Sequence, residues 1–565
     1  MIQLSRRFVT LTALIAIVGF AGSASAQDKI DRSLREGRNQ GHSQMAIIKI
    51  KPGYETWARY LLAQRGKQIE SELPSINAVT AELTSADLDA ICLTGFALGC
   101  SGDVPISPSA VKVEKGAAIL RTHRESTLLG ALGINPSVTG GYGVTVALID
   151  SGIYPAPAFG NRIKAFYDFT QGGVPRTPYD DYGHGTHVAG LIGGLQTHED
   201  VQYEGVAPAV QFVGLKVLDK NGRGKTSDVI SAIQFAIANK QRLGIDIINL
   251  SLGHPIFEPA ASDPLVQAVE RATKAGIIVV ASAGNHGVDQ NGNLGFAGVT
   301  SPGNAPSVIT VGAADHNDTV TRDDDRMTVY SSSGPTWYDG LVKPDVVAPG
   351  HMLVSVSSPT SSLVKGYPKL MKKGDSGEKF LQLSGTSMAA GVTSGVVALL
   401  KQAMPELTPN LAKGVLQFTA IPMHDDAGDA YSALRQGTGE INGEGGIKLV
   451  SRIKTRITNL ERPWALMQPR TTIAGETYAW AGNIVWGDNI VWGDSVYYNL
   501  PIWGLNIVWG NNIVWGDNIV WGDNIVWGDG LADDNIVWGN NIVWGIGSLA
   551  GLGSGTAHTK ISVSL

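Results

Sequence analysis

Cysteine is almost absent from this chain of 565 residues, which contains only Cys92 and Cys100. A network of disulfides is therefore excluded as the main source of its stability. The two cysteines lie close together near the N-terminus, and in an oxidising compartment they could close one small loop. If the segment that carries them is removed, the remaining protein has no cysteine, and its stability must come from core burial, with bound ions as a further source.

Blocks of like charge are missing as well. The formal net charge is −6, and basic and acidic residues are interspersed along the chain. This pattern offers no electrostatic footprint for nucleic acid or for an anionic membrane, so we predict neither partner. The chain is several times longer than a usual domain of about 100–200 residues, so we expect three or four parts rather than one compact core.

One apolar run stands at the N-terminus. Arg6 and Arg7 precede the run Phe8 to Gly22, and Ala24-Ser25-Ala26 follows it. Charged, apolar and small-residue segments in this order are typical of a secretory signal peptide with its cleavage site. The alternative is a membrane anchor, but the apolar run is short for a membrane span. We predict that residues 1–26 are a cleaved signal peptide and that the protein is secreted or lies in the cell envelope.

Residues 27–120 show the periodicity of a small α+β module. The segment 121–143 that follows is polar and rich in turn residues, so we place the end of the module between residues 112 and 130. The expected strands are Met45–Ile50, Ile76–Leu83 and Val111–Val113, and the expected helices are Tyr54–Gly66 and Ala86–Leu93.

Residues 121–450 alternate short apolar runs with helical patterns. Runs of this kind are typical of strands buried on both faces, so we predict an α/β domain whose mostly parallel sheet is covered by helices on both faces. The expected strands are Val144–Ile149, Phe212–Val217, Ile245–Leu250, Ile277–Ala281 and Val308–Val311, and the expected helices are Thr226–Asn239, Pro264–Lys274, Met388–Met404 and Pro409–Phe418.

After a linker at 451–482, a short repeat fills residues 483–545, and a tail follows at 546–565. The pentapeptide Asn-Ile-Val-Trp-Gly occurs eight times, mostly at a spacing of six, and contains eight of the thirteen tryptophans. Such a period is too short for a helix pair but fits one strand plus one corner, because Gly, Asp and Asn tolerate left-handed backbone angles. We predict a β-solenoid or a similar stacked array.

Three motifs stand in a fixed order: Ala-Leu-Ile-Asp-Ser-Gly ending at Gly152, Gly-His-Gly-Thr-His-Val-Ala-Gly starting at Gly183, and Ser-Gly-Thr-Ser-Met-Ala-Ala starting at Ser384. Together they resemble the subtilisin, or subtilase, family. The resemblance implies a subtilisin-like serine endopeptidase that acts on proteins or peptides. It also implies that residues 27–120 are a cleavable prosegment that inhibits the enzyme, although a permanent N-terminal domain is the alternative.

The resemblance assigns the catalytic triad to Asp150, His184 and Ser387. The residues themselves support these roles. Asp150 ends an apolar strand at the carboxyl edge of the sheet, where it could orient a histidine. His184 opens a helix, and an imidazole with an ordinary pKa of about 6.5 suits a general base. Ser387 starts a helix rich in small residues, whose free N–H groups face a developing oxyanion. Taken singly, the aspartate could be a turn residue and the serine an N-cap.

Other residues near these motifs have two interpretations each. Asn285 follows an apolar strand, and the resemblance makes it the oxyanion donor, although Asn after Ala-Gly is also an ordinary turn residue. His187 shares a helix face with His184, which would suit a metal pair, but no third ligand accompanies them, so we assign it to packing.

Two glycine-bearing segments resemble the family's walls of the peptide cleft, which pair with substrate main chain. The expected substrate-binding residues are Gly222, Gly224, Ser251, Leu252 and Gly253. Backbone pairing of this kind implies broad endopeptidase activity. His254 stands where the family commonly has glycine, and Arg223 stands between two glycines; we interpret both as solvated side chains.

The chemistry requires no cofactor, and structural calcium is a prediction that the resemblance suggests. The acidic runs 323–325 and 425–426 lack a recognisable calcium-loop signature, so we interpret them as solvated turns and name no metal ligand. Two other functions stay open: a surface-binding protein whose protease fold is only a scaffold, and a narrowly specific processing protease. The repeat could bind a cell-surface polymer or protein, or form a stack whose tryptophans fill its own core.

Overall fold

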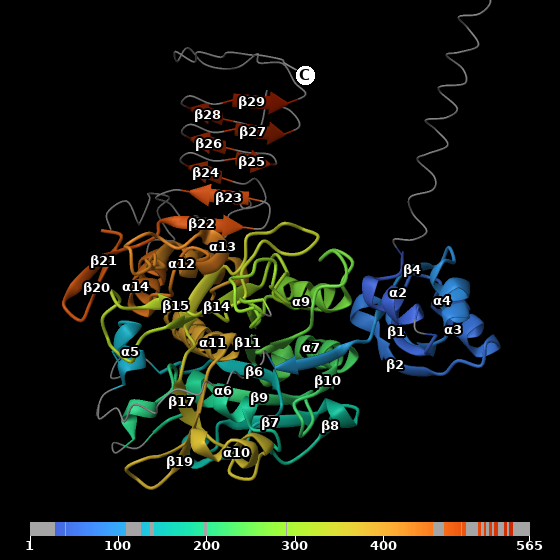
Figure 1. The fold of residues 1–565 in the computed structure, drawn as a ribbon, viewed down its shortest axis with the longest axis horizontal. Coiled ribbons are helices and arrows are strands. Elements are labelled where there is room, and N and C mark those ends of the chain that lie inside the picture. Colours follow the sequence, from blue (N-terminus) through green and yellow to red (C-terminus); the bar gives the residue numbers. More distant parts are fainter. Residues whose placement is uncertain are drawn as a thin grey trace, which may run out of the picture.

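The computed structural model describes residues 29–39, 41–108, 126–135, 140–196, 200–289, 291–455, 468–486, 489–492, 507–509, 513–515, 519–521, 525–528, 536–538 and 542–545. Three bodies are visible in Figure 1: a small upstream module in blue, a large α/β body, and a stack of short strands in orange and red. The predicted signal peptide and the predicted strand Val111–Val113 lie outside the described residues. No helix within these ranges is long and apolar enough to cross a membrane.

The large body is organised around a nine-stranded sheet in the order β15-β14-β13-β11-β6-β9-β7-β8, with β16 also paired to β14. Seven of these strands run parallel to one another: β14, β13, β11, β6, β9, β7 and β16. The other two pair antiparallel, β8 with β7 and β15 with β14. The bounds are β6 Thr145–Asp150, β7 Ile163–Asp168, β8 Val174–Pro175, β9 Gln211–Lys216, β11 Ile245–Leu250, β13 Ile278–Ser282, β14 Ile309–Asp315, β15 Arg326–Met327 and β16 Val346–Pro349.

Helices cover both faces of this sheet (Figure 1), as the sequence predicted. Alternate residues of β6 enter two different cores: Val146 and Leu148 pack in one, and Ala147 and Ile149 in the other. The first core also contains α6 His184–Gly193, α11 Thr386–Ala403 and α12 Pro409–Thr419, and the second contains α7 Thr226–Ala238 and α9 Pro264–Lys274.

Local sequence explains where α9 begins and why α11 can be buried. Asp263 accepts hydrogen bonds from the N–H groups of Leu265 and Val266, and Pro264 occupies the first turn, so α9 starts with a cap and a preset backbone angle. In α11 every residue from Thr386 to Leu400 is buried. Small side chains allow this: a β-carbon added at Gly395 would lie 2.5 Å from Cβ of Val206.

Smaller elements surround the large body. Two further sheets have three strands each. One has the order β17-β19-β18, and the other has the order β10-β5-β12, in which β5 is Pro105–Pro108 of the upstream module. The bounds are β10 Gly224–Lys225, β12 Leu252–Gly253, β17 Leu353–Val356, β18 Met371–Lys373, β19 Lys379–Leu383, β20 Arg470–Ile473, β21 Glu476–Ala479, α5 Thr127–Ala131, α8 Lys240–Leu243, α10 Ser362–Gly366, α13 Ala433–Gln436 and α14 Gly443–Thr455, with 3₁₀ turns η3 Pro157–Phe159, η4 Phe169–Gln171, η5 Val201–Tyr203 and η6 Pro368–Leu370.

The upstream module is an antiparallel sheet in the order β2-β3-β1-β4 with helices on one side and its own apolar core. Cys92 and Cys100 form a disulfide that ties α4 to β4, with their Cα atoms 5.7 Å apart. The bounds are α2 Arg32–Arg38, β1 Gln44–Ile50, α3 Glu55–Gln64, β2 Ile69–Leu73, η2 Pro74–Ile76, β3 Ala78–Leu83, α4 Ser85–Cys92, β4 Ala97–Gly102 and β5 Pro105–Pro108.

The module rests on α7 and α9 of the large body (Figure 1). Ile47, Leu73 and Ile76 of the module belong to the same core as these two helices. Asp103 accepts hydrogen bonds from the backbone N–H and the hydroxyl of Ser227, at 2.8 and 2.7 Å. Because α7 receives no cap from the side chain of its own preceding residue, the module supplies the cap of that helix.

Strands of the repeat stack above the large body (Figure 1). β22 and β23 pair antiparallel, and β24, β26 and β28 then form one parallel ladder while β25, β27 and β29 form another. From β24 onward, each described repeat strand therefore pairs with the next but one. The bounds are β22 Asn483–Trp486, β23 Asn489–Trp492, β24 Ile507–Trp509, β25 Ile513–Trp515, β26 Ile519–Trp521, β27 Ile525–Gly528, β28 Ile536–Trp538 and β29 Ile542–Gly545.

Candidate active site

Asp150 is the last residue of β6 and is fully buried at the carboxyl end of the sheet. Its Oδ1 accepts the N–H of Ser151 at 2.7 Å. Both of its carboxylate oxygens face Nδ1 of His184, at 2.8 and 3.0 Å. A buried carboxylate in this position holds the imidazole with Nδ1 protonated, and Nε2 is then available as a base.

His184 is the first residue of α6 and is also fully buried. The helix approaches β6 closely because Gly185 has no side chain: a β-carbon there would lie 2.2 Å from the carbonyl oxygen of Gly152 and 3.1 Å from Cβ of Asp150. Gly185 therefore permits the contact between the aspartate and the histidine. Within the described part of the chain, Nε2 of His184 is buried and accepts or donates no hydrogen bond.

Ser387 stands in the first turn of α11, and its Oγ donates a hydrogen bond of 2.9 Å to the carbonyl of Ser251. Ser251 directly follows β11, whose residue Leu250 pairs with Ile149 of β6. The neighbouring strand ends therefore bring Ser251, and with it Ser387, beside Asp150. In this state the hydroxyl of Ser387 is bonded to Ser251 and not to the histidine, whose Nε2 makes no hydrogen bond among the described residues.

Asn285 lies in the turn after β13 and is buried. Its side-chain oxygen accepts hydrogen bonds from N–H and Oγ1 of Thr386, at 3.0 and 3.1 Å. Thr386 directly precedes the nucleophile, so this pair fixes which end of the Asn285 amide faces away from α11. Sequence reasoning missed Thr386, because a threonine before the serine looked only like part of the motif.

The strand β5 of the upstream module lies between β10 and β12 of the large body and is antiparallel to both. Ile106 pairs with Gly224, Ser107 with Gly253 and Pro108 with Leu252. Three of the expected substrate-binding residues, Gly224, Leu252 and Gly253, thus hold an extended peptide. Ile106 and Pro108 are buried, whereas Pro105 and Ser107 are exposed.

The other expected cleft residues are placed differently. Gly222 lies in the turn before β10, with φ +71°, and does not pair with β5; a β-carbon there would lie 2.6 Å from the ring of Tyr182. Arg223 is exposed, as expected. His254 corrects our expectation of a solvated side chain: it is buried, and its ring stacks on Phe257 with 5.9 Å between centroids.

His187 is buried one turn along α6 from His184, and its Nε2 lies 3.2 Å from the carbonyl of Leu353 and 2.9 Å from that of Leu381. Burial lowers the pKa of His187 to about 3. A neutral ring that bridges two carbonyls ties α6 to β17 and β19, which agrees with the packing role.

The acidic runs also find partners within the protein. Asp426 pairs with Arg326 at 2.7 Å. Asp325 is buried beside Arg322 and Glu440, and burial raises the pKa of Asp325, so this residue is not the solvated turn that we expected. Among the residues with described positions, no group of three or more His, Cys, Asp or Glu side chains is arranged to hold a metal ion.

Comparisons with known proteins agree with this arrangement. Residues 141–439 match the Subtilase family. The chain is 35% identical over 400 residues to Serine protease AprX of Bacillus subtilis (strain 168), a match that covers 70% of this chain and 84% of that protein. It is 35% identical over 286 residues to Subtilisin DY of Bacillus licheniformis, covering 50% and 86%. The chain belongs to the subtilase family. This subtilase is accordingly a serine endopeptidase.

A solved structure shows the same fold. Fervidolysin from Fervidobacterium pennivorans, described as a keratinolytic enzyme related to subtilisin, matches with a TM-score of 0.56 at 21% identity. The match covers 72% of this chain and 61% of the fervidolysin chain, which is under two thirds of its length. It supports the fold of the subtilase and carries no conclusion about its substrate.

Proposed function

We propose that this subtilase hydrolyses internal peptide bonds through the triad Asp150, His184 and Ser387. The contact of both Asp150 oxygens with Nδ1 of His184, beside the start of α11, carries this proposal. Oγ of Ser387 attacks the scissile carbonyl while Nε2 of His184 accepts its proton, and Asp150 stabilises the imidazolium that forms. His184 then donates the proton to the leaving amine, and water hydrolyses the acyl-enzyme.

The negative charge of the tetrahedral intermediate needs donors that are already in place. We assign this role to the Nδ2–H group of Asn285 and the backbone N–H of Ser387. Support comes from Thr386, which holds the oxygen end of the Asn285 amide. The N-terminus of α11 adds a partial positive charge on the same side.

We further propose that the upstream module is a prosegment that inhibits the enzyme until it is cut away. Its strand β5 occupies the place of a substrate between β10 and β12. The ladder runs toward Ser251, whose carbonyl accepts the hydroxyl of Ser387. We therefore place the maturation cut soon after Pro108, somewhat upstream of the junction that the sequence suggested.

Replacing the nucleophile tests both proposals. Ser387→Ala should abolish peptide hydrolysis and leave the full chain uncut when it is produced in a protease-free host, because one nucleophile performs both reactions. The measurements are activity on a casein or peptide substrate and the mass of the purified chain. If the variant still matures by itself, the assignment of Ser387 is wrong.

Export of the enzyme and the role of the repeat belong to the same proposal. We propose that the protein is exported by its N-terminal segment, because residues 1–26 have the composition of a signal peptide.

The two parallel ladders support a two-faced β-solenoid in which two repeats complete one turn. Tryptophan fluorescence distinguishes a self-packed stack from a binding surface: blue emission that added glycan does not change supports the stack.

A further inference from the structure

Asp180 is a fully buried carboxylate that lies four residues before the catalytic histidine. Its Oδ1 accepts hydrogen bonds from the N–H of Gly183 at 2.7 Å and from the hydroxyl of Ser151 at 2.9 Å. Its Oδ2 accepts from N–H and Oγ1 of Thr186, at 2.9 and 2.6 Å. Every one of these partners can donate a hydrogen, which favours the ionised carboxylate.

These bonds join the two elements that carry Asp150 and His184. Ser151 directly follows Asp150 at the end of β6, and its Oγ also accepts the N–H of Gly185 in α6. A chain of hydrogen bonds therefore runs from the end of β6, through Ser151 and Asp180, to the residues on both sides of His184.

The first turn of α6 depends on this carboxylate. The residue before the helix is Gly183, which has no side chain to cap the free N–H groups. Asp180 replaces that cap, since it accepts the N–H of Thr186 in the first turn. Burial raises the pKa of Asp180, and the hydrogen bonds from Thr186 and Gly183 and the charge of Lys216 oppose that rise.

We propose that Asp180 is a positioning residue for peptide hydrolysis: through Ser151 and the first turn of α6 it holds Asp150 and His184 in the geometry in which they react. Asp180 touches neither substrate nor the reacting atoms. The inference rests on the proposed triad, whose own test is Ser387→Ala.

The variant Asp180→Asn keeps the shape of the side chain but removes its charge and one acceptor. We expect kcat to fall ten- to a hundredfold while KM changes little, because the groups that bind substrate are untouched. The acid limb of the pH–rate profile should move to lower pH, because a displaced Asp150 stabilises the imidazolium of His184 less well. Titration of active sites with a serine-directed sulfonyl fluoride gives the fraction of folded enzyme.

The matched control is Asp168→Asn. Asp168 is equally buried and accepts three hydrogen bonds, from N–H and Oγ1 of Thr170 and from the hydroxyl of Tyr179, but none of these donors contacts the triad. The control should lower thermal stability and leave kcat and the pH profile of the folded enzyme unchanged. Equal losses of kcat in the two variants, or an unmoved acid limb in Asp180→Asn, would overturn the proposal.

A second variant covers the case in which Asp180→Asn does not fold. Ser151→Ala breaks the link between β6 and Asp180 but leaves the bonds of Asp180 to α6 in place. We expect a smaller loss of kcat, three- to tenfold, with KM unchanged. A Ser151→Ala enzyme with the kcat and pH profile of the parent would overturn the proposal, even if Ser387→Ala confirms the triad.

Discussion

At the scale of single residues, the sequence motifs pointed to the residues of the proposed triad but not to their supports. Asp150 and His184 were predictable because their motifs, in this order with the serine motif, resemble those of the subtilase family. Asp180 was not predicted, because an aspartate in a short polar stretch has no signature of such a role. One local signal was available: a helix that begins after glycine has no cap of its own, so another side chain must supply an acceptor.

The first residue-scale prediction concerns Asn285. Asn285→Ala should fold and mature slowly, with kcat lower by a factor on the order of 10²–10³, a magnitude taken from subtilisin itself. The reason is that one oxyanion donor is lost while the backbone N–H of Ser387 remains; the two hydrogen bonds from Thr386 to Asn285 are lost as well. Initial rates on a peptide substrate measure the effect, and Asn293→Ala, in an exposed loop, is the control. Normal turnover in Asn285→Ala would mean that the oxyanion is bound elsewhere.

The second residue-scale prediction is a pH dependence of stability that arises from His187. The folded protein keeps this ring neutral down to about pH 3, whereas an unfolded chain protonates it near the ordinary value of 6.5. The stabilising contribution is therefore complete above pH 6.5 and is lost as pH falls from there toward 3. The free energy of unfolding should decrease by at most about 1.4 kcal/mol per pH unit from this group.

Urea unfolding of the inactive Ser387→Ala chain measures this slope without self-digestion. His187→Gln cannot take up a proton and should show a shallower loss between pH 6.5 and 4, from a lower starting stability. Identical slopes in the two proteins would assign the acid sensitivity to other groups.

At the scale of secondary structure, the well-patterned elements were predictable and the short irregular ones were not. β11 and α9 match the predicted ranges residue for residue, because both carry a clear apolar pattern and α9 also has a cap. β5 was missed because it contains two prolines, which argue against a strand. It becomes a strand only because β10 and β12 provide partners, and that information is absent from its own sequence.

The prediction at this scale concerns the buried helix α11. Gly395→Ala should destabilise the protein by about 1–3 kcal/mol although alanine favours helices, because the added methyl group would overlap Val206 at the contact with α6. Thermal unfolding measures the loss. Gly366→Ala, where no atom lies within 4 Å of an added β-carbon, should leave the stability nearly unchanged.

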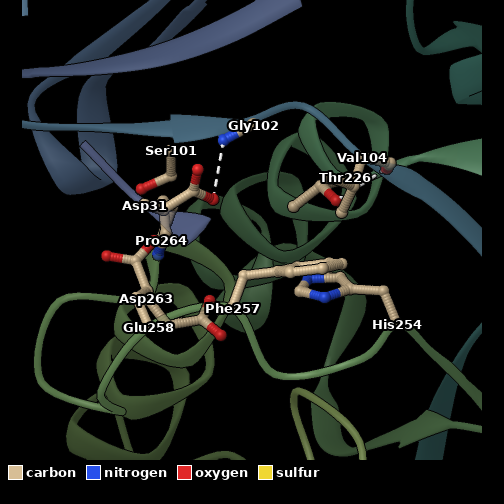
Figure 2. A pocket seen from close by; sticks show the side chains of 10 residues that line it. All are labelled: Asp31, Ser101, Gly102, Val104, Thr226, His254, Phe257, Glu258, Asp263 and Pro264. Carbon is tan, nitrogen blue, oxygen red and sulfur yellow. Dashed lines mark hydrogen bonds between the residues drawn. The ribbon is translucent and has the colours of Figure 1, made fainter. Parts of the chain in front are cut away.

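At the scale of the whole molecule, the boundary between the upstream module and the large body buries more acidic than basic side chains. Figure 2 shows a pocket at this boundary where Asp31, Glu258 and Asp263 gather beside Ser101. Lys49 of the upstream module enters this cluster: its Nζ lies 3.8 Å from Glu258 and donates to the carbonyl of Ser262. Nearby, Arg32 lies over the ring of Phe257, which also stacks on His254.

The last prediction follows from that excess of carboxylates. Burial, and to a smaller extent Asp263 and Asp31, raise the pKa of Glu258 to about 7, against the opposing effect of Lys49. If the module is cut away as proposed, Glu258 faces water and its pKa returns toward its ordinary value of 4.5. Binding of the prosegment therefore takes up a proton, so its affinity is highest below pH 4.5 and is lost as pH rises through 7.

The measurement is the inhibition constant of residues 27–108, added as a separate chain to mature enzyme between pH 5 and 8. The affinity should weaken by up to about tenfold per pH unit as far as pH 7 and then level off. Glu258→Gln should flatten this dependence and bind tightly throughout, whereas Glu406→Gln, which is exposed and distant, should behave like the parent. A flat profile in the parent enzyme would contradict the prediction.

The cap that Asp103 provides to α7 would make the start of this helix a reporter of whether the upstream module is still bound. One end of this helix is capped by a residue of the upstream module, so the proposed cut would remove the cap and leave the sequence of α7 unchanged. If the module leaves as proposed, the amide of Ser227 loses the carboxylate that accepts its hydrogen bond. Its hydrogen exchange should quicken while the middle of α7 stays protected, and the exchange rate of this amide alone would then report what fraction of the molecules has been released.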